Sequence, residues 1–139
     1  MRGYLNRPEE TARTVVDGWL HTGDVGRFDE DGYLTIVDRI KDMIIRGGFN
    51  VYPTEVEEAL LRHPDIAAVA VIGVPDETYG EEVCAVVVPA AAVTAEDVIA
   101  YGRAHLAKHK YPRRVEFVTE LPLGPSHKVL KRELKRQFV

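Results

Sequence analysis

Two long apolar runs near the middle of the chain constrain its fold more than any other feature. Residues 66–74 read IAAVAVIGV and residues 82–89 read EVCAVVVP, with a loop of turn-forming residues between them. Both runs are rich in β-branched residues and are therefore predicted to be strands. Residues 115–118, VEFV, are predicted to form a third strand of the same sheet.

Helical patterns alternate with these strands. Pro53 opens a predicted helix over residues 53–61, because a proline there loses no hydrogen bond and the acids after it complement the helix dipole. Thr94 opens a second helix, in a pattern like a capping box, that is expected to end near His109. A last helix is predicted over residues 129–138. Together these patterns predict an α+β fold, in which helices cover a small sheet.

The first part of the chain is expected to be a connecting segment followed by a hairpin. One helix is predicted to start before Pro8 and to end at Gly18. The turn residues 29–32, DEDG, separate two predicted strands, at 25–28 and 33–37. A short strand at 43–46 then leads into a Gly-Gly turn.

Composition excludes several classes of protein. The 139 residues suffice for one compact domain, and the mixed charges, with a net of −4, give no global reason to expect nucleic acid. No run approaches the roughly 20 apolar residues of a membrane span. The N-terminus lacks the apolar core of a signal peptide, and the single Cys84 has no partner for an internal disulfide. The chain is expected to be cytoplasmic.

Charge is distributed unevenly along the chain. Residues 1–99 carry 8 Lys and Arg against 19 Asp and Glu, whereas residues 100–139 carry 10 against 3. A basic segment of this kind can bind nucleic acid or the phosphates of a nucleotide. Aromatic residues do not alternate with the basic ones, which argues against a platform for single-stranded nucleic acid. A solvated helix face is the simpler interpretation for most of these residues.

Several polar residues have side chains that suit a nucleotide or phosphate ligand. The carboxylate of Asp24 can accept two hydrogen bonds side by side from ribose hydroxyls, and the fork of Arg39 can bind the same ribose or a phosphate. Lys128 follows a stiff loop and is expected at the start of the last helix. The helix dipole disfavours a cation there, so the lysine side chain is expected to point away from the helix, toward an anion. The turn Gly47-Gly48 allows close approach of a narrow ligand.

Each of these residues has a simpler alternative. Asp24 could bond its own backbone in a turn, Arg39 could pair with a neighbouring aspartate, the two glycines could form only a tight turn, and Lys128 could be solvated. The five histidines and the cysteine show no zinc-binding spacing, so no metal site is expected. The chain also contains no nucleophile elbow and no phosphate-binding GxxxxGK[ST] loop.

Four motifs resemble one known family when taken in order. They are HTGD at 21–24, DRIKD at 38–42, RGGFNVYPTEVE at 46–57 and GPSHKVLKREL at 124–134. Their order and spacing are similar to those in the C-terminal part of AMP-forming acyl-CoA synthetases, which belong to the adenylate-forming superfamily. The first four residues, MRGY, resemble the interior of such an enzyme, so the chain is expected to be a fragment or an isolated C-terminal domain.

The resemblance implies a role for each site residue. Lys128 would be catalytic, reaching the α-phosphate and the carboxylate during adenylation. Residues 1–38 would be the connecting segment and hairpin, Asp38 the hinge, and residues 39–139 the mobile C-terminal domain. The nucleotide and CoA contacts would come from a further set of residues: Asp24, Arg39 and Asn50 at the nucleotide, and Gly47 and Gly48 at the tunnel for the pantetheine of CoA.

The same resemblance implies the cofactors and partners. ATP or AMP and CoA would bind, with Mg²⁺ held through a large N-terminal adenylation domain that this chain lacks, and the substrate would be a small carboxylic acid. The chain alone would then be nearly inactive. A stand-alone, non-catalytic binding or regulatory module of the same fold is the alternative. It is motivated by the missing domain and by His127, which stands where the family usually has glycine. Histidine is tolerable at a positive φ, with a strain of about 1–2 kcal/mol.

Overall fold

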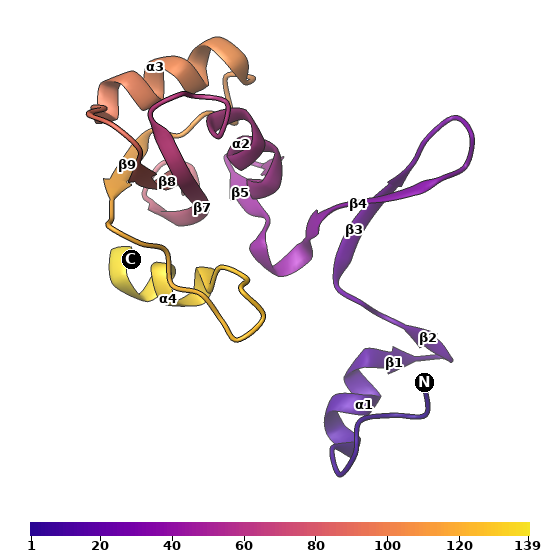
Figure 1. Cartoon of the computed structure of the whole chain (residues 1–139). Coiled ribbons are helices and arrows are strands. Elements are labelled where there is room, and N and C mark those ends of the chain that lie inside the picture. Colours follow the sequence, from indigo (N-terminus) through magenta and orange to yellow (C-terminus); the bar gives the residue numbers. More distant parts are fainter. The chain divides into compact units, whose positions relative to one another are not determined.

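The computed structural model describes all 139 residues, and its backbone divides into two compact units, Met1–Lys41 and Asp42–Val139 (Figure 1). Four helices and nine strands are arranged as the α+β fold that the sequence predicts. The division into units does not test whether Asp38 is a hinge, so the hinge stays a prediction. No helix in the chain is both long and apolar enough to cross a membrane.

The first unit begins with a helix that is shorter than predicted. Helix α1 covers Pro8–Thr14, and the residues after it form a small hairpin of β1 (Val15–Val16) and β2 (Trp19–Leu20). The prediction that the helix reaches Gly18 is therefore wrong. Asp17 and Gly18 both have positive φ, 50° and 82°, as a two-residue type I′ hairpin turn requires.

A second hairpin completes this unit and confirms the prediction made from the DEDG turn. Strands β3 (Asp24–Phe28) and β4 (Leu34–Arg39) pair antiparallel, with a bulge between Val25 and Gly26. A single 3₁₀ turn, η1 (Ile40–Asp42), follows β4. Asp38 is the one buried residue among residues 1–41, so this unit has no apolar core of its own.

The second unit is built on the two apolar runs. Strands β7 (Ile66–Asp76) and β8 (Gly80–Pro89) pair antiparallel along their whole length, further than predicted. Strand β9 (Arg114–Phe117) pairs parallel with β8, as a third strand of the same sheet. Strands β5 (Ile44–Arg46) and β6 (Phe49–Val51) extend this sheet in the order β6-β5-β8-β7.

Helices cover both faces of this sheet (Figure 1). Helices α2 (Pro53–Leu60) and α3 (Ala95–His105) pack on one face, whereas α4 (Lys131–Phe138) packs on the other. Successive residues of a strand point to opposite faces, so β7 and β8 contribute alternate side chains to two separate cores. This explains why both strands are apolar without interruption. The first core includes Val56, Leu60, Val71, Val83, Ala85, Val87 and Val98, and the second includes Ala70, Ile72, Cys84, Val86 and Leu134.

Two helix boundaries differ from the predictions. The capping box of Thr94 and Asp97 starts α3 as expected, but the helix ends at His105 and not near His109, because Leu106 takes an extended conformation and packs on the first core. Helix α4 begins at Lys131, later than the predicted residue 129. The residues before it are held instead by a β-bridge between Leu123 and Val129.

Candidate functional site

Asp24 and Arg39 form an ion pair at the end of the second hairpin. They face each other across β3 and β4, and Nε of Arg39 donates to Oδ1 of Asp24 at 3.0 Å. The two side chains are 32% and 52% exposed. An exposed pair of this kind is worth at most about 1 kcal/mol, so a ribose diol can compete for the carboxylate at little cost. The hairpin thus brings together two of the residues predicted to bind the nucleotide.

Asp38 lies beside this pair and is buried, with 7% of its surface exposed. Its Oδ1 accepts a hydrogen bond from the backbone N–H of Arg39 at 2.7 Å. Its partner across the hairpin is Val25, next to the bulge. Asp38 is therefore held by its backbone neighbour at the end of β4, directly before the 3₁₀ turn that leads into the second unit.

Gly47 and Gly48 form the two-residue turn between β5 and β6. Their φ angles are 55° and 83°, and the flanking residues Arg46 and Phe49 are paired, as in a type I′ hairpin. The N–H of Gly47 donates to the carbonyl of Tyr79 at 2.8 Å. A Cβ on Gly47 would lie only 3.0 Å from the Tyr79 ring. The absence of a side chain at Gly47 is what lets this ring pack against the turn.

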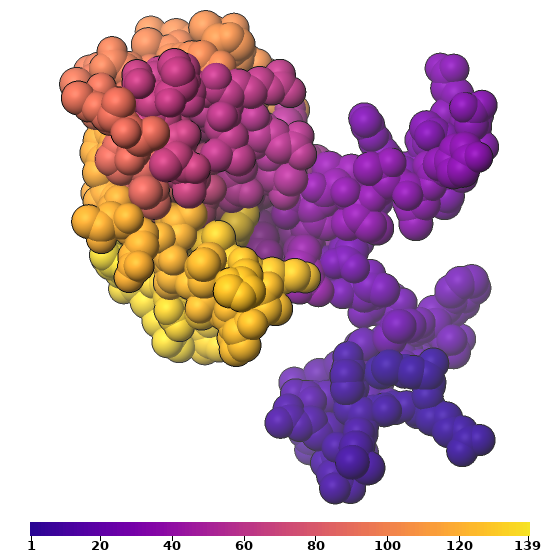
Figure 2. Space-filling view, in the orientation of Figure 1, coloured from indigo at the N-terminus to yellow at the C-terminus, as the bar shows by residue number.

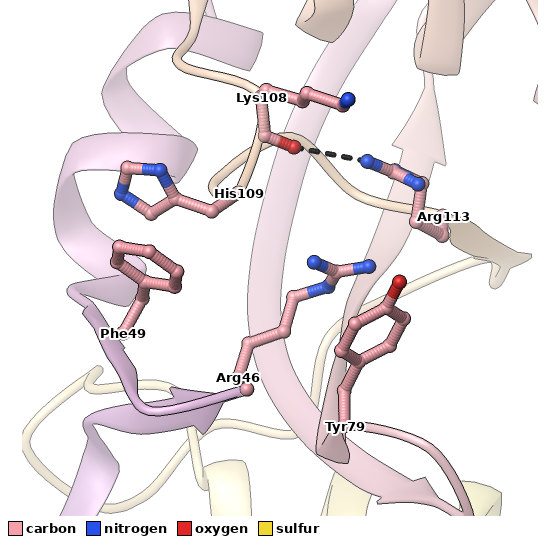
Figure 3. Close-up of a pocket in the computed structure, with 7 residues that line it drawn as sticks. Arg46, Phe49, Tyr79, Lys108, His109 and Arg113 are labelled. Atoms are coloured by element: carbon pink, nitrogen blue, oxygen red, sulfur yellow. Dashed lines mark hydrogen bonds between the residues drawn. The ribbon is translucent and has the colours of Figure 1, made fainter.

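A cleft of about 330 Å³ opens beside this turn (Figure 3). Phe49 and His109 stack on one side of it, with ring centres 4.7 Å apart, and Tyr79 and Arg113 lie on the other. The full lining is Arg46, Gly47, Phe49, Tyr79, Lys108, His109 and Arg113. Apart from Gly47, sequence reasoning did not predict these residues. Lys108, His109 and Arg113 belong to the basic stretch KHKYPRR, for most of which a solvated helix face was the simpler interpretation.

The two arginines of the cleft differ in their hydrogen bonding. Both Nε and Nη2 of Arg46 donate to the carboxylate of Glu82, which raises the pKa of Arg46, and its guanidinium lies 4.0 Å from the centre of the Tyr79 ring. Arg113 donates from Nη2 to the carbonyl of Lys108 at 2.9 Å, but its buried Nε has no hydrogen-bond partner.

The Nε atom of Arg113 is buried and is therefore not exposed to the cleft, and the guanidinium lies 4.0 Å from the centre of the Tyr111 ring. The cleft is basic because Lys108 and Arg113 are among its lining residues, and a guanidinium matches the oxygens of a phosphate in geometry and charge. The stacked rings of Phe49 and His109 provide an aromatic surface on the side of the cleft opposite Arg113 (Figure 3). The arrangement suits a ligand that combines phosphate groups with a flat aromatic ring.

Lys128 lies in a tight loop and not at the start of a helix as predicted. The loop is closed by backbone hydrogen bonds from Gly124 to the carbonyl of Lys128 and from Leu130 to the carbonyl of Pro122, both at 2.8 Å. Lys128 itself is exposed, and the loop lies at the surface of the second unit (Figure 2). The dipole of α4, which begins only at Lys131, therefore does not direct the side chain of Lys128.

The residue before this lysine has the backbone conformation that glycine usually provides. His127 has a φ of 57°, in the left-handed region. Histidine is among the more tolerant non-glycine residues there, and the strain is of order 1–2 kcal/mol. The loop thus keeps a glycine-like turn immediately before Lys128.

The remaining predicted site residue, Asn50, is exposed on β6 opposite Ile45. It belongs to the same hairpin as Gly47 and Gly48. Each unit therefore carries its own group of predicted site residues, Asp24 and Arg39 in the first, and the glycine turn, Asn50 and Lys128 in the second. No group of three or more His, Cys, Asp or Glu side chains that could hold a metal ion occurs in the chain.

Comparisons with known proteins relate the chain to one group. Residues 55–128 match the family described as the AMP-binding enzyme C-terminal domain. Over 99% of its length, the chain is 54% identical to 3-[(3aS,4S,7aS)-7a-methyl-1,5-dioxo-octahydro-1H-inden-4-yl]propanoyl:CoA ligase of Rhodococcus jostii (strain RHA1), covering 27% of that protein. The chain thus spans little more than a quarter of the length of this relative.

Two solved structures agree with this relation. The o-succinylbenzoate CoA synthetase of Bacillus subtilis, in complex with an acyl-adenylate intermediate, superimposes with a TM-score of 0.90 at 39% identity, and the match covers 97% of this chain and 28% of that one. An amide bond synthetase from Marinactinospora thermotolerans gives a TM-score of 0.90 at 48% identity, over 100% of this chain and 29% of that one.

Proposed function

The chain belongs to the family of AMP-binding enzyme C-terminal domains, and we propose that it acts as the C-terminal part of an AMP-forming acyl-CoA ligase. In the first half-reaction, the carboxylate of a small acid attacks the α-phosphate of ATP, which forms an acyl-adenylate and releases pyrophosphate. In the second, the thiol of CoA attacks the acyl carbon, so that a thioester forms and AMP leaves.

Lys128 serves the first half-reaction in this proposal. Its ammonium group stabilises the negative charge that develops around the α-phosphate and the carboxylate, which is an electrostatic role. Asp24 and Arg39 hold the ribose hydroxyls, and Asn50 lies beside the nucleotide. The weak, exposed ion pair of Asp24 and Arg39 supports this assignment, since neither side chain is committed to a strong internal contact.

The cleft beside Gly47 is the observation that carries the second half-reaction. It joins a side-chain-free turn, through which a pantetheine arm can pass, to a pocket with stacked rings and the basic side chains of Lys108 and Arg113. CoA has the matching chemistry, a narrow thiol arm at one end and an adenine nucleotide with phosphates at the other. We therefore assign the pantetheine to the Gly47-Gly48 turn and the nucleotide end of CoA to the cleft.

The partner in this proposal is the N-terminal adenylation domain of the same enzyme. The first unit supports it, because the unit buries no apolar residue of its own and leaves Leu5 89% and Trp19 77% exposed. Exposed apolar surface of this kind marks an interaction site. The acyl pocket and Mg²⁺ are assigned to that domain as well. Asp38 is the hinge about which residues 39–139 reorient between the half-reactions.

A cytoplasmic location is part of the same proposal.

Amide formation is a second candidate, because an amide bond synthetase is 48% identical to this chain. In that case an amine, and not CoA, would attack the acyl-adenylate. The basic cleft favours CoA, since an amine has no phosphates for Arg113. Product analysis of the full-length enzyme with CoA or with amines as acceptors separates the two candidates.

The proposal is tested with the isolated chain and with the full-length ligase that contains it. The chain alone should form no acyl-adenylate from ATP and any of a panel of carboxylic acids. Robust turnover would contradict the proposal that the chain carries only part of the active site. In the full-length enzyme, Lys128→Ala should lower the rate of adenylation by roughly 10²–10³-fold, as the loss of one electrostatic stabiliser does. The same variant should still form thioester from supplied acyl-adenylate, and an equal loss of both steps would refute the assigned role.

A further inference from the structure

An ion pair joins the helices on opposite faces of the sheet. Nζ of Lys131, the first residue of α4, lies 2.7 Å from Oε1 of Glu57 in α2. The two side chains are only 18% and 19% exposed. The same carboxylate oxygen also accepts a hydrogen bond from the backbone N–H of Val71 in β7, at 2.8 Å. Three elements therefore meet at one oxygen atom.

The position of β7 explains this arrangement. In the order β6-β5-β8-β7, strand β7 is the last of the sheet and pairs only with β8. Its outer edge would leave backbone N–H groups without partners, and Glu57 supplies an acceptor for one of them. Because α2 and α4 cover opposite faces, the ion pair spans the outer edge of the sheet.

The ion pair also lies next to the end of the loop that carries Lys128. The N–H of Leu130 donates to the carbonyl of Pro122, and the N–H of Gly124 donates to the carbonyl of Lys128, so that residues 122–130 form one closed loop. Lys131 is joined directly to the end of this loop. Helix α4 spans only eight residues, and Leu134 is its one fully buried side chain. Phe138 also packs on the second core, and Lys135 lies 4.0 Å from Glu81 farther along the helix. The ion pair of Lys131 is therefore the polar contact of α4 that lies nearest to the loop.

We propose that Glu57 is a positioning residue for Lys128, which it holds in place through Lys131. This inference rests on the role proposed above for Lys128 in adenylation. Glu57 is not among the residues that line the cleft assigned to the second half-reaction, which come from the β5–β6 hairpin, the β7–β8 connection and the segment after α3. A shift of about 1 Å in a catalytic group can cost about 100-fold in rate, so loss of the ion pair should slow adenylation alone.

The first test measures positioning directly, by amide hydrogen exchange in the 139-residue chain. Glu57→Gln keeps an acceptor for Val71 but removes the charge that binds Lys131. Exchange at Gly124 and Leu130 should become at least several-fold faster. Exchange at Val118, which bonds to β8, should stay unchanged. Glu58→Gln is the matched control, because Glu58 is an exposed neighbour on the same helix. This control should leave the exchange rates of all three amides unchanged. Unaltered exchange in the loop of Glu57→Gln would overturn the inference.

The second test measures the two half-reactions in the full-length ligase. Glu57→Gln and Lys131→Met should each lower the adenylation rate about 10- to 100-fold, and the double variant should be no worse than either. Thioester formation from supplied acyl-adenylate, and the KM for CoA, should stay near wild type. Equal losses in both steps would indicate general destabilisation and would refute positioning.

The Lys128→Ala variant, assayed in parallel, separates the two proposals. If that variant loses adenylation while Glu57→Gln keeps it, only the positioning role is refuted. If Lys128→Ala itself retains adenylation, the proposed function of Lys128 is wrong.

Discussion

Replacing Gly47 by alanine should show how the glycine turn and the Tyr79 ring depend on each other. The new Cβ would lie 3.0 Å from Cδ1 of Tyr79, whereas a Cβ on Gly48 would meet nothing within 4 Å. Both glycines have positive φ, so both alanine variants acquire left-handed strain of about 1–2 kcal/mol. The smaller entropy of the unfolded alanine chain offsets about 0.4–1 kcal/mol of this in each case. Only Gly47→Ala adds a steric clash.

The size of the clash follows from the contact distance. Carbon atoms in contact prefer a separation of about 3.5–4.0 Å, so the Tyr79 ring must retreat by roughly 0.5–1 Å. The guanidinium of Arg46 lies 4.0 Å from the centre of the Tyr79 ring and helps to hold the ring in place. Moving the ring off its rotamer should cost about 0.5–1.5 kcal/mol. Gly47→Ala should therefore lower the unfolding free energy by about this much more when the Tyr79 ring is present than when it is absent.

A double-mutant cycle isolates this coupling free energy. Urea unfolding of the 139-residue chain gives the change in unfolding free energy for Gly47→Ala in the wild type and in a Tyr79→Ala background. The substitution should cost less in the background that lacks the ring. Gly48→Ala is the matched control and should cost the same in both backgrounds. An equal cost of Gly47→Ala in both backgrounds would refute the reasoning.

Three further predictions concern residues outside the glycine turn. Arg46→Met should destabilise the chain by about 3–5 kcal/mol in urea unfolding, because it leaves the carboxylate of Glu82, whose side chain is only 12% exposed, without its guanidinium, and Arg46→Met with Glu82→Gln should recover part of that loss. Burial raises the pKa of the Cys84 thiol to about 11, so iodoacetamide at pH 8 should label the unfolded chain and spare the folded one; rapid labelling of the folded chain would contradict the buried position. The hydrogen bonds from Thr94 lower the pKa of Asp97 below its ordinary 3.8, so the capping box stabilises the folded chain above that pH and loses this contribution as the pH falls through the lowered pKa. The stability difference between wild type and Thr94→Ala should therefore be constant near neutral pH and shrink in acid, and a difference that grows in acid would contradict the assignment.

Most elements of the second unit could be predicted because their signals are local. Pro53 and Thr94 start helices through interactions within one turn, and the β-branched runs of β7 and β8 favour strands residue by residue. The missed boundary at Gly18 shows where local signals compete. Val15 and Val16, followed by Asp17-Gly18, favour a hairpin more strongly than the helix that Pro8 starts.

The residues of the candidate site also fall into those that the sequence could predict and those that it could not. Lys128, Asp24, Arg39 and the glycine turn could be named from motifs, because each motif is a short stretch of characteristic residues. The residues of the basic cleft could not, since Lys108, His109 and Arg113 reach Gly47 only through the pairing of β5 and β9 with β8. The sequence shows a basic cluster there but no sign of which charges have partners.

What the amino-acid order alone determines here is which segments become strands and helices, and which motifs carry candidate chemistry. Tertiary structure decides which side chains share a surface. The ion pair of Glu57 and Lys131 exists only because α2 and α4 cover opposite faces of one sheet and meet at its outer edge. Local preferences act over a few residues, whereas an ion pair depends on distances between segments that only the folded sheet brings together.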